Sequence, residues 1–427
     1  MSPDVLSLLP PGSSLREDGM LAVGGCRADE LAREFDTPVL VVAERALRDR
    51  AREYRRELDA RWPRSRVVFA SKAFPCTAVQ RVMAEEGLGL DVAGAGEIAT
   101  ALKAGVDPAL VVLHGNAKSG EEIAMAVEHG LGLVVVDNAD DVDRLEATVP
   151  AGRAQDVLVR VIPGVTADTH ASVLTGHAGS KFGLAPRAAA ELIRRIEHSP
   201  RLRMCGLHVH VGSQILAVEP FAQSVAPVAA LGEFPVYDLG GGLGARSTYA
   251  DDPPSVGAYL DALAGAAREH LPREAELIIE PGRSMVASAA TTLYRVVTVK
   301  RGARTFVAVD GGMGDNLEVA LVGQRFEAAI ADRVGAGGGE PVSVVGRHCE
   351  SGDVLIDEIA LPFPRVGDVL AVPVTGAYCF TMANNYKRRP PHPRGVRERR
   401  CGPTGRAARD AGRPAGARRR LRPGPAG

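Results

Sequence analysis

The stretch Val67-Val68-Phe69-Ala70-Ser71-Lys72-Ala73-Phe74 joins an apolar, β-branched and aromatic run to a lysine. Such a run is typical of a buried strand, and the following Pro75 ends it because proline cannot donate to a strand ladder. A lysine that an apolar strand carries inward is costly unless its charge is paired or lost. Burial lowers the pKa of a lysine, and the neutral amine is a nucleophile towards carbonyl groups. Lys72 is therefore a candidate nucleophile; the alternative is an ammonium group that reaches solvent at the strand end.

The composition of the 427-residue chain is that of a globular protein, with 45% hydrophobic and 24% charged residues. The sequence has no run of the roughly 18 apolar residues that a membrane span needs, and residues 1–14 lack the pattern of a signal peptide. We therefore expect a soluble, cytoplasmic protein with no membrane partner. The cysteines show no CxxC spacing, which argues against a structural zinc site and a disulfide framework; they are Cys26, Cys76, Cys205, Cys349, Cys379 and Cys401.

Eight short apolar runs alternate with stretches of helical spacing between residues 67 and 290. This alternation predicts βαβ units and a parallel sheet. Eight units in a segment of this length match a (β/α)8 barrel, typically of about 250 residues, better than an open sheet. The predicted strands are residues 67–72, 87–92, 110–114, 132–137, 157–162, 204–211, 235–239 and 276–280.

Polar residues and glycines gather at the carboxyl ends of these runs. In a (β/α)8 barrel those ends share one face, and that face holds the active site. The sequence therefore predicts a single site built from Lys72, Asp91, His114, Asn116, Arg160, His210, Ser213, Gly240, Gly241, Gly242, Glu280 and Arg283.

The segments on either side of the barrel differ from it. We expect residues 43–290 to form the barrel domain and residues 1–42 to join a second domain, residues 291–386. That domain is predicted to be all β, because it consists of short β-type runs between Gly-rich or Pro-containing turns, at 291–299, 305–309, 342–345 and 369–374.

Residues 387–427 have another composition, with 14 basic and two acidic residues and almost no side chains large enough to pack. We expect this tail to be disordered. Because the rest of the chain is acidic overall, we expect no nucleic-acid partner. The abrupt change at residue 387 leads to the hypothesis of a shifted reading frame, which resequencing the 3′ end of the gene tests.

Two motifs follow the last two predicted strands. Asp238-Leu239-Gly240-Gly241-Gly242-Leu243-Gly244 allows backbone N–H groups to approach an anion, and the loop after the seventh strand of a barrel is a frequent phosphate site. In Glu280-Pro281-Gly282-Arg283 the carboxylate needs a cationic partner, such as a protonated ring nitrogen, and the guanidinium suits a phosphate or carboxylate. The alternative is that Glu280 and Arg283 pair with each other.

His208-Val209-His210 places two imidazoles on one face of a strand. The spacing suits a metal ion in a hydrolase barrel, but few histidines follow and clustered carboxylates are not evident in the sequence. We favour a flat aromatic group stacked on one ring, with the other ring in the core, and we expect no metal ion.

The stretch Arg347-His348-Cys349-Glu350-Ser351-Gly352-Asp353 is unusually polar for a β domain. It sets a thiol beside an imidazole and a carboxylate, so Cys349 is a candidate nucleophile or proton donor. Tyr378 is a further candidate, for which core packing is the alternative.

Taken together, eight motifs resemble those of the fold-type III pyridoxal-phosphate decarboxylases, most of all the diaminopimelate decarboxylases, over roughly residues 20–386. The resemblance implies an alanine-racemase-type barrel followed by a Greek-key β-barrel domain that the N-terminal segment completes. The motifs are Phe69-Ala70-Ser71-Lys72-Ala73, Asp91-Val92-Ala93-Gly94-Ala95-Gly96-Glu97, His114-Gly115-Asn116-Ala117-Lys118, Ser180-Lys181-Phe182-Gly183, His208-Val209-His210-Val211-Gly212-Ser213-Gln214, the glycine run, Glu280-Pro281-Gly282-Arg283 and His348-Cys349-Glu350-Ser351-Gly352-Asp353.

The resemblance implies pyridoxal 5′-phosphate as the cofactor. Lys72 is then the lysine that forms the aldimine with it, His210 stacks on its ring, and Glu280 pairs with its ring nitrogen. The remaining cofactor and substrate contacts implied are those of Asp91, Ser213, Gly240, Gly241, Gly242, Gly282, Arg283 and Tyr378.

The resemblance also implies a homodimer with shared active sites, in which Cys349 and Glu350 reach in from a second subunit. Cys349 then returns a proton to the α-carbon, and Glu350 meets the distal amine of the substrate. The implied reaction is the decarboxylation of meso-2,6-diaminopimelate to L-lysine.

The chain departs from the family pattern at two places. Glu318 and Val322 replace an arginine and a tyrosine that hold the distal carboxylate of the substrate, and a glutamate repels a carboxylate. An ornithine or lysine decarboxylase, with a distal cation on its substrate, is therefore the alternative, followed by a metal-dependent barrel hydrolase and a non-catalytic relative. After Tyr386 the basic tail replaces strands of the β domain, so we expect that domain to be truncated, with open edges.

Overall fold

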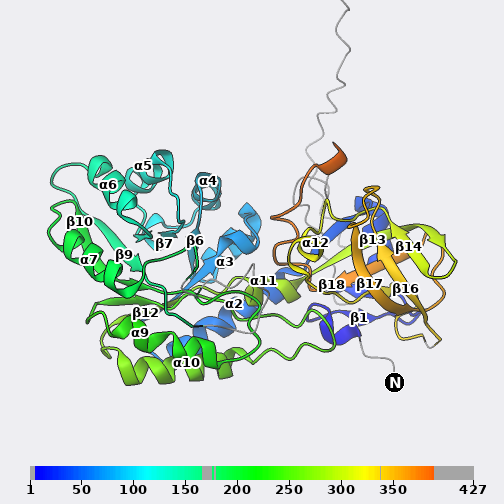
Figure 1. The fold of residues 1–427 in the computed structure, drawn as a ribbon. Helices are drawn as coiled ribbons and strands as arrows, with labels where there is room; N and C mark the ends of the chain where they lie inside the picture. The colour runs from blue at the N-terminus through cyan, green and yellow to red at the C-terminus, as the bar shows by residue number, and fades with distance from the viewer. Residues whose placement is uncertain (1–4, 166–175, 177–178, 337, 389–427) are drawn as a thin grey trace, which may run out of the picture.

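The computed structural model describes residues 5–165, 176, 179–336 and 338–388 and has two lobes (Figure 1). One lobe is a closed barrel of eight parallel strands, and the other is built on a separate, mostly antiparallel sheet. The predicted fold class, a (β/α)8 barrel with a β domain, is thereby confirmed. The barrel strands are β5 (Ser65–Ala70), β6 (Gly89–Val92), β7 (Val111–Leu113), β8 (Leu133–Val136), β9 (Gln155–Arg160), β10 (Leu202–His208), β11 (Val236–Asp238) and β12 (Glu276–Ile279).

The barrel closes because its last strand pairs with its first. Leu277 of β12 aligns with Ser65 of β5, in the same parallel sense as every other pair of neighbouring barrel strands. Each of the eight predicted runs falls on one of these strands. The carboxyl ends of the strands therefore meet at one mouth, as the sequence predicted.

Alternate residues of each strand pack on opposite sides of the barrel wall. Val68, Val112 and Ile278 belong to a cluster made of strand residues only, which fills the barrel interior. Val67 and Phe69 instead join the large cluster between the strands and the helices. Burying one such side chain stabilises the fold by about 1.5–3 kcal/mol. Strand β5, which leads into the turn with Lys72, is therefore packed on both of its faces.

Helices cover the outside of the barrel and return the chain from one strand to the next (Figure 1). Several helices have capped N-termini. The helix that follows Ser119 begins with a capping box between Ser119 and Glu122, and Asn138 caps the next helix. The helices of this lobe are α2 (Glu44–Asp59), α3 (Thr77–Glu85), α4 (Ala95–Ala104), α5 (Gly120–His129), α6 (Ala139–Thr148), α7 (Pro186–Glu197), α8 (Glu219–Gln223), α9 (Val225–Ala229), α10 (Val256–His270) and α11 (Arg283–Val286), with short 3-10 turns η2 (Ser71–Ala73), η3 (Pro108–Leu110) and η5 (Ala287–Ala289).

The second lobe is a seven-stranded sheet. Its strands are β13 (Ala290–Lys300), β14 (Thr305–Val309), β15 (Ala329–Ile330), β16 (Glu340–Val345), β17 (Val354–Leu361) and β18 (Val369–Pro373), joined by β4 (Val39–Val42), with the short helix α12 (Glu318–Val322) beside them. The strand β17 was missed from the sequence, because its run Val354–Leu361 carries Asp357 and Glu358 on exposed positions. Closure of this sheet into a Greek-key barrel stays a prediction.

The N-terminal segment packs on this sheet. It contains η1 (Val5–Leu8), β1 (Ser14–Leu15), β2 (Leu21–Val23), β3 (Cys26–Arg27) and α1 (Ala28–Phe35) before β4. Strand β4 pairs antiparallel with β13, with Leu40 opposite Thr292. Leu21 and Leu31 share a buried cluster with Leu293 and Ala371 of the sheet. The N-terminal segment therefore packs on the second lobe, and the division into residues 1–42, 43–290 and 291–386 stays a prediction.

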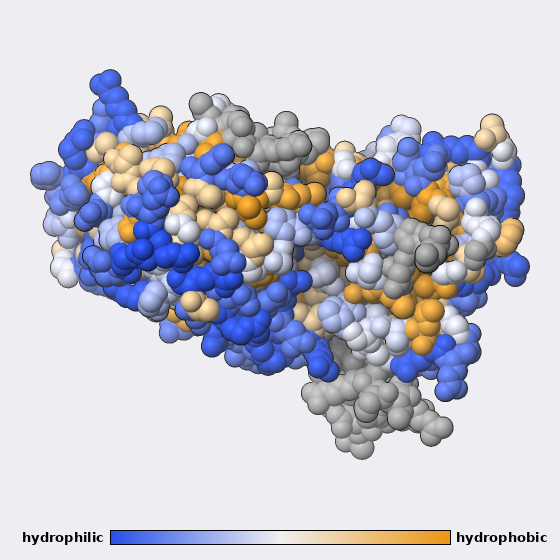
Figure 2. Space-filling view, turned by 90° about the horizontal axis from the view of Figure 1, so that it is seen from below, coloured by the Kyte–Doolittle hydropathy of each residue, from blue (hydrophilic) through white to orange (hydrophobic). Residues whose placement is uncertain are grey.

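The described chain ends with the turn η6 (Tyr386–Arg388). The expectation that residues 387–427 are disordered concerns, from residue 389 on, positions outside the described residues. Among the helices that the structure describes, none is long and apolar enough to cross a membrane. Hydrophilic side chains cover much of the barrel side in Figure 2, whereas hydrophobic ones gather on the β-domain side.

Candidate active site

Lys72 lies at the mouth of the barrel, in η2 directly after β5, with 43% of its side chain exposed. Its Nζ is 3.5 Å from Oδ2 of Asp91, a buried residue of the neighbouring strand β6. The negative charge of Asp91 outweighs burial and raises the pKa of Lys72 above its ordinary value. Our expectation that burial lowers this pKa is therefore wrong, because the adjacent strand supplies a carboxylate to the amine.

Glu280 follows β12 directly and is buried between two histidines. Its Oε1 is 2.6 Å from Nε2 of His114, and its Oε2 is 3.3 Å from Nε2 of His208. The two imidazole rings meet edge to face at 4.8 Å. Asp238, at the end of β11, completes a buried group of four side chains whose polar atoms lie within 4.8 Å of one another.

The four side chains of this group differ in their protonation. Burial favours a neutral Glu280, but His114 and His208 outweigh it and hold the pKa of Glu280 well below its ordinary value. Burial raises the pKa of Asp238 well above its ordinary value, and the charge of Glu280 adds to the effect. Burial lowers the pKa of His208 to about 3. At neutral pH Glu280 is therefore the anion of this group and the His208 ring is neutral.

The two histidines of His208-Val209-His210 have different surroundings. His208 is in the core against Glu280, whereas His210 lies outside the group of four. The geometry of that group could hold a metal ion, but it uses His114 and Asp238 in place of His210. Sequence reasoning missed this group because a strand-end position does not say which neighbouring strands meet. The period of two along β10 was the available signal for His208.

The glycine run after β11 is packed against its neighbours. A Cβ on Gly241 would lie 2.0 Å from the carbonyl oxygen of Glu280, so only glycine fits there. Gly240 donates its N–H to Oδ1 of Asp238 at 3.0 Å, and Gly241 donates to Nδ1 of His210 at 3.2 Å. Both amides therefore have hydrogen-bond partners within the chain, and a contact of the glycine run with an anion stays a prediction.

The hydrogen bond from Gly241 also orients the ring of His210. Since Nδ1 accepts this hydrogen bond, the proton of the neutral ring is on Nε2. Burial and the charge of Lys72 lower the pKa of His210 well below its ordinary value, so the ring is neutral. A neutral, oriented imidazole near Lys72 is suited to lie against a flat ring.

Arg283, the first residue of α11, pairs with Glu318 of α12 and not with Glu280. Its Nη2 donates to Oε1 of Glu318 at 2.7 Å and its Nη1 donates to Oε2 at 3.1 Å. Its guanidinium lies 4.8 Å from the centre of the Tyr378 ring, and its Nε donates to Oγ of Ser213 at 3.4 Å. The alternative pairing of Glu280 with Arg283 is therefore wrong, since each carboxylate has its own partners.

Tyr378 and Gly282 bring these elements against the lysine turn. Tyr378 has a positive φ of 60° and donates its backbone N–H to the carbonyl of Ala73 at 2.9 Å. A Cβ on Gly282 would lie 3.0 Å from Cβ of Ala70. Val322 is half-buried at the end of α12, one turn after Glu318.

Cys349 and Glu350 lie in the loop between β16 and β17 and are exposed. Glu350 accepts a hydrogen bond from the hydroxyl of Tyr386 at 3.1 Å, and Lys387 donates to the carbonyl of Cys349 at 2.7 Å. Strands β16 and β17 are in the β lobe, on the side away from barrel strands β6 and β7 (Figure 1). Among the described residues, the hydrogen bonds of Cys349 and Glu350 are with Ser351, Asp353, Tyr386 and Lys387, and none of these bonds joins the loop to Lys72, Asp91 or Glu280.

The shape of that loop depends on Asp353, which sequence reasoning left without a role. Its carboxylate is buried and accepts from the backbone N–H of His348 at 2.8 Å and of Met313 at 2.6 Å. Its Oδ2 is also 2.8 Å from Nδ1 of His348. Cys349 has a φ of 50°, a conformation that a well-anchored loop can hold.

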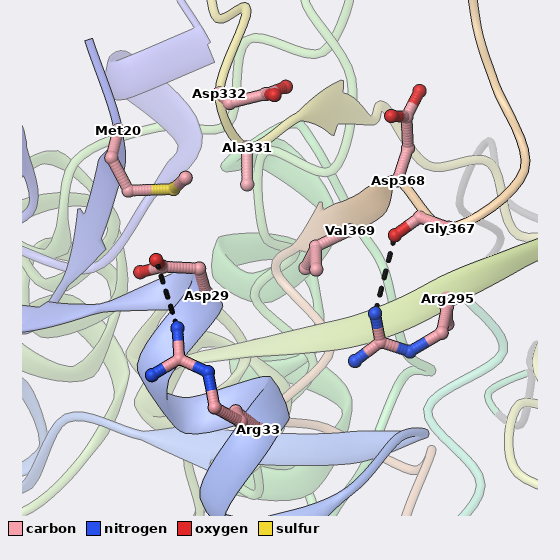
Figure 3. A pocket seen from close by; sticks show the side chains of 9 residues that line it. All are labelled: Met20, Asp29, Arg33, Arg295, Ala331, Asp332, Gly367, Asp368 and Val369. Atoms are coloured by element: carbon pink, nitrogen blue, oxygen red, sulfur yellow. Dashed lines mark hydrogen bonds and ion pairs between the residues drawn. The ribbon is translucent and has the colours of Figure 1, made fainter. Parts of the chain in front are cut away.

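A cavity of about 300 Å³ lies elsewhere, between the N-terminal segment and the sheet (Figure 3). Figure 3 shows Arg33 bonded to Asp29 on one wall and Arg295 bonded to the carbonyl of Gly367 on the other. The barrel contributes nothing to it. Its lining residues are Met20, Asp29, Arg33, Arg295, Ala331, Asp332, Gly367, Asp368 and Val369.

The residues at the barrel mouth fit the cofactor that the sequence resemblance implies. Lys72 offers a partly exposed amine for an aldehyde, and the ring of His210 is oriented by the glycine run. Glu280 is a buried carboxylate held between His114 and His208, and Asp91 is a buried carboxylate beside the amine of Lys72. Buried anionic oxygens of this kind favour a cationic group such as a protonated ring nitrogen.

Comparisons with known proteins agree with this fit. A family model described as "Pyridoxal-dependent decarboxylase, pyridoxal binding domain" matches residues 44–287. The diaminopimelate decarboxylase of Actinosynnema pretiosum subsp. auranticum is 45% identical over 402 residues, covering 90% of this chain and 89% of the relative. That of Bacillus subtilis (strain 168) is 40% identical over 396 residues, covering 88% of this chain and 90% of the relative.

Solved structures give the same result. The diaminopimelate decarboxylase of M. jannaschii has a TM-score of 0.83 at 30% identity, covering 90% of this chain and 92% of that one. The Helicobacter pylori enzyme complexed with L-lysine has a TM-score of 0.80 at 27% identity, covering 85% and 92%. A lysine decarboxylase from Selenomonas ruminantium, at 22% identity, shares the fold. The chain therefore belongs to the pyridoxal-dependent decarboxylases and, within them, to the diaminopimelate decarboxylase family.

Proposed function

We propose that the protein is a pyridoxal-phosphate enzyme that decarboxylates meso-2,6-diaminopimelate to L-lysine. The observation that carries the proposal is the arrangement of Lys72, Asp91 and Glu280 at one barrel mouth. It occurs in a chain that is 45% and 40% identical to two diaminopimelate decarboxylases over most of its length. The ornithine and lysine alternatives have no support at comparable identity among these relatives.

Lys72 would hold the cofactor through its Nζ. Asp91, 3.5 Å from Nζ, steadies the ammonium form of Lys72 and so keeps a proton at this amine when it is not bound. When bound, pyridoxal phosphate supplies an electron sink for the electron pair that carbon dioxide leaves behind.

Glu280 would hold a proton on the ring nitrogen of that group. Its low pKa makes it an anion at neutral pH, and its burial strengthens its attraction for a cation. His210 would lie against the ring, in the orientation that Gly241 gives it. The remaining contacts to phosphate and substrate are assigned to Asp91, Ser213, Gly240, Gly241, Gly242, Gly282, Arg283 and Tyr378.

Cys349 and Glu350 act from the partner subunit of a homodimer. Both are exposed and lie outside the Lys72 site of their own chain, as residues that serve a second copy would. The thiol of Cys349 delivers a proton to the carbon that lost carbon dioxide, and the carboxylate of Glu350 binds the distal ammonium of the substrate. Exposed apolar side chains on the β lobe, Val297, Phe363 and Val366, offer surface for such an assembly.

We also place the enzyme in the cytoplasm, because an exposed catalytic thiol needs a reducing compartment. Fractionation of producing cells, followed by antibodies to the protein, checks this assignment. Light scattering of the purified protein checks the dimer, which has twice the 44.8 kDa of the chain.

The activity is tested by following carbon dioxide and lysine formation from meso-diaminopimelate, L-lysine and L-ornithine. The holoenzyme is expected to release carbon dioxide from diaminopimelate and to make lysine in equal amount. Lys72→Ala removes the covalent link, so the visible absorbance of the bound cofactor and the activity are both expected to disappear. Lys103→Ala, an exposed lysine on α4, is the matched control.

Two results would overturn the proposal. Protein that is folded but indifferent to added pyridoxal phosphate would remove the cofactor assignment. Protein that binds the cofactor but releases carbon dioxide only from lysine or ornithine would leave the cofactor assignment standing and contradict the proposed substrate.

A further inference from the structure

The turn after β7, His114-Gly115-Asn116-Ala117-Lys118, has no role in the proposed function, although its histidine and its lysine are both buried. The Nζ of Lys118 donates to the carbonyl of Gly115 at 2.6 Å and to Oδ2 of Asp141 at 2.7 Å. The side chains of Lys118 and Asp141 are 1% and 0% exposed. A buried lysine that is bonded both to its own turn and to the next helix restricts the shape of that turn.

Two further hydrogen bonds fix the same turn to its neighbours. The side-chain amide of Asn138, which caps α6, donates to the carbonyl of Asn116 at 3.1 Å. The backbone N–H of His114 donates to the carbonyl of Val92, at the end of β6, at 2.8 Å. The backbone that carries His114 is therefore held from two sides, which leaves its ring little freedom to move.

The rings of His114 and His208 each hold one oxygen of the Glu280 carboxylate. Nε2 of His114 lies 2.6 Å from Oε1, and Nε2 of His208 lies 3.3 Å from Oε2. The three side chains are at most 6% exposed. An ionised carboxylate only accepts hydrogen bonds, so the proton of each contact is on the ring nitrogen. Turning the carboxylate of Glu280 would break both contacts at once.

Glu280 keeps the capacity to bind a further donor. A carboxylate offers about four lone-pair sites, and the two histidines use two of them. Burial alone would favour the neutral acid, but the two histidines lower the pKa of Glu280. The arrangement therefore presents a charged carboxylate in one fixed orientation.

We propose that His114 and His208 are positioning residues for the cofactor: acting through Glu280, they hold its carboxylate in one orientation towards the ring nitrogen and make the site select a cofactor whose ring nitrogen is protonated. The turn that ends at Lys118 supports His114 in this role. The proposal uses the pyridoxal-phosphate assignment and not the substrate, so it goes beyond the proposed decarboxylation and is tested apart from it.

The test compares two cofactors that differ at one ring atom. Pyridoxal 5′-phosphate has the ring nitrogen, whereas 1-deazapyridoxal 5′-phosphate has a C–H group in its place; both keep the aldehyde and the phosphate. Full-length protein is freed of cofactor, checked for folding by circular dichroism and titrated with each compound in a calorimeter. The readout is the ratio of the two dissociation constants, which involves no turnover.

Wild-type protein is expected to bind pyridoxal phosphate at least about tenfold more tightly than the deaza compound, because only the former brings a charged donor to Glu280. Glu280→Gln should bring the two affinities within about threefold of each other. His114→Leu and His208→Leu, which lose the N–H, should each reduce the wild-type ratio by about fivefold. His129→Leu, at an exposed histidine of α5, is the matched control and should keep the ratio.

Rescue by a conservative substitution separates positioning from packing. The amide nitrogen of glutamine can take the place of Nε2, so His114→Gln should keep most of the wild-type ratio. Asparagine is too short to reach Oε1, so His114→Asn should behave like His114→Leu. The asparagine variant also decides the question if the leucine variant does not fold.

A double variant tests whether His114 acts through Glu280. In the Glu280→Gln background there is no anion to hold, so His114→Leu should change the ratio by less than about twofold. Three results would overturn the proposal: a wild-type protein that does not discriminate, a His114→Leu protein that loses affinity for both cofactors by the same factor, and an undiminished effect of His114→Leu in the Glu280→Gln background. Since no substrate is present, a failed decarboxylation assay leaves these results readable.

Discussion

The barrel mouth and the loop between β16 and β17 both carry reactive side chains, but only the barrel mouth forms a site within one chain. Around Lys72 and Glu280 a single chain brings together residues from six barrel strands or the turns after them. The loop with Cys349 is equally well anchored, through Asp353, yet its thiol faces solvent. The difference agrees with the proposal that the cofactor site is built by one chain and that Cys349 serves the site of a partner subunit.

The proposed difference between the barrel mouth and the Cys349 loop is tested most directly by mixing two inactive variants. Cys349→Ala should lower kcat by about 10³-fold through loss of a proton donor, while the absorbance of the bound cofactor stays unchanged. Lys72→Ala should lose both. Mixed in equal amounts after reversible dissociation, the two should regain about a quarter of wild-type activity, because half the dimers of a two-fold assembly are mixed and each holds one intact site.

Two outcomes would contradict the division of labour. Undiminished product formation by Cys349→Ala would remove the proton-donor role. A mixture without recovered activity, although dimers exchange subunits, would place both residues in the same chain's site.

Asp315 and Glu280, one buried carboxyl of each lobe, have pKa values shifted in opposite directions, and pH separates the two. In the β lobe, burial raises the pKa of Asp315 to about 7, although Tyr294 donates to its Oδ2 at 2.7 Å. Glu280 of the barrel has two histidines and a lowered pKa instead. Native Asp315 thus keeps its proton up to about pH 7, whereas the unfolded carboxyl releases it near 3.8.

Between these pH values the folded state binds one more proton than the unfolded state, so stability falls as the pH rises through this window and levels off above about pH 7. The loss should be roughly 4 kcal/mol at most, at about 1.4 kcal/mol for each unit. Asp315→Asn imitates the protonated form and should flatten this part of the curve. Urea unfolding from pH 4.5 to 8 measures it, with Asp252→Asn, an exposed residue, as control; equal slopes for Asp315→Asn and wild type would contradict the assignment.

The barrel lobe was the easier one to predict, for a physical reason. Each barrel strand is a continuous apolar run because both of its faces are buried, so all eight were found. Strand β17 is not a continuous apolar run, because the exposed residues Asp357 and Glu358 interrupt it, and it was missed. The position of Lys72 followed from its strand, but its pKa did not, because Asp91 comes from another strand. Likewise, the partner of Arg283 was unpredictable, since Glu318 lies 35 positions away in another lobe.

A third prediction concerns the backbone of the barrel site. Gly241→Ala would set a Cβ about 2.0 Å from the carbonyl oxygen of Glu280 and push the glycine run away from β12. We expect a loss of about 3 kcal/mol in stability and weaker cofactor binding, since His210 loses the N–H that orients it. Gly265→Ala in α10, where nothing lies within 4 Å, is the control. Unaltered cofactor affinity in Gly241→Ala would show that the close packing of this turn does not support the site.

The smallest expected effect tests whether the Cys349 loop is truly preformed. Asp353→Asn keeps the size of the side chain but loses the charge that holds the two backbone N–H groups and His348, which should cost about 2 kcal/mol. Because the loop presents the thiol without touching the cofactor, kcat should fall severalfold while the cofactor spectrum and the affinity for pyridoxal phosphate stay at wild-type values. Ser351→Ala, exposed in the same loop, should leave both kcat and stability unchanged. If Asp353→Asn instead weakened cofactor binding, the barrel mouth and the Cys349 loop would be coupled within one chain. The proposal that the loop serves the site of a partner subunit would then be contradicted.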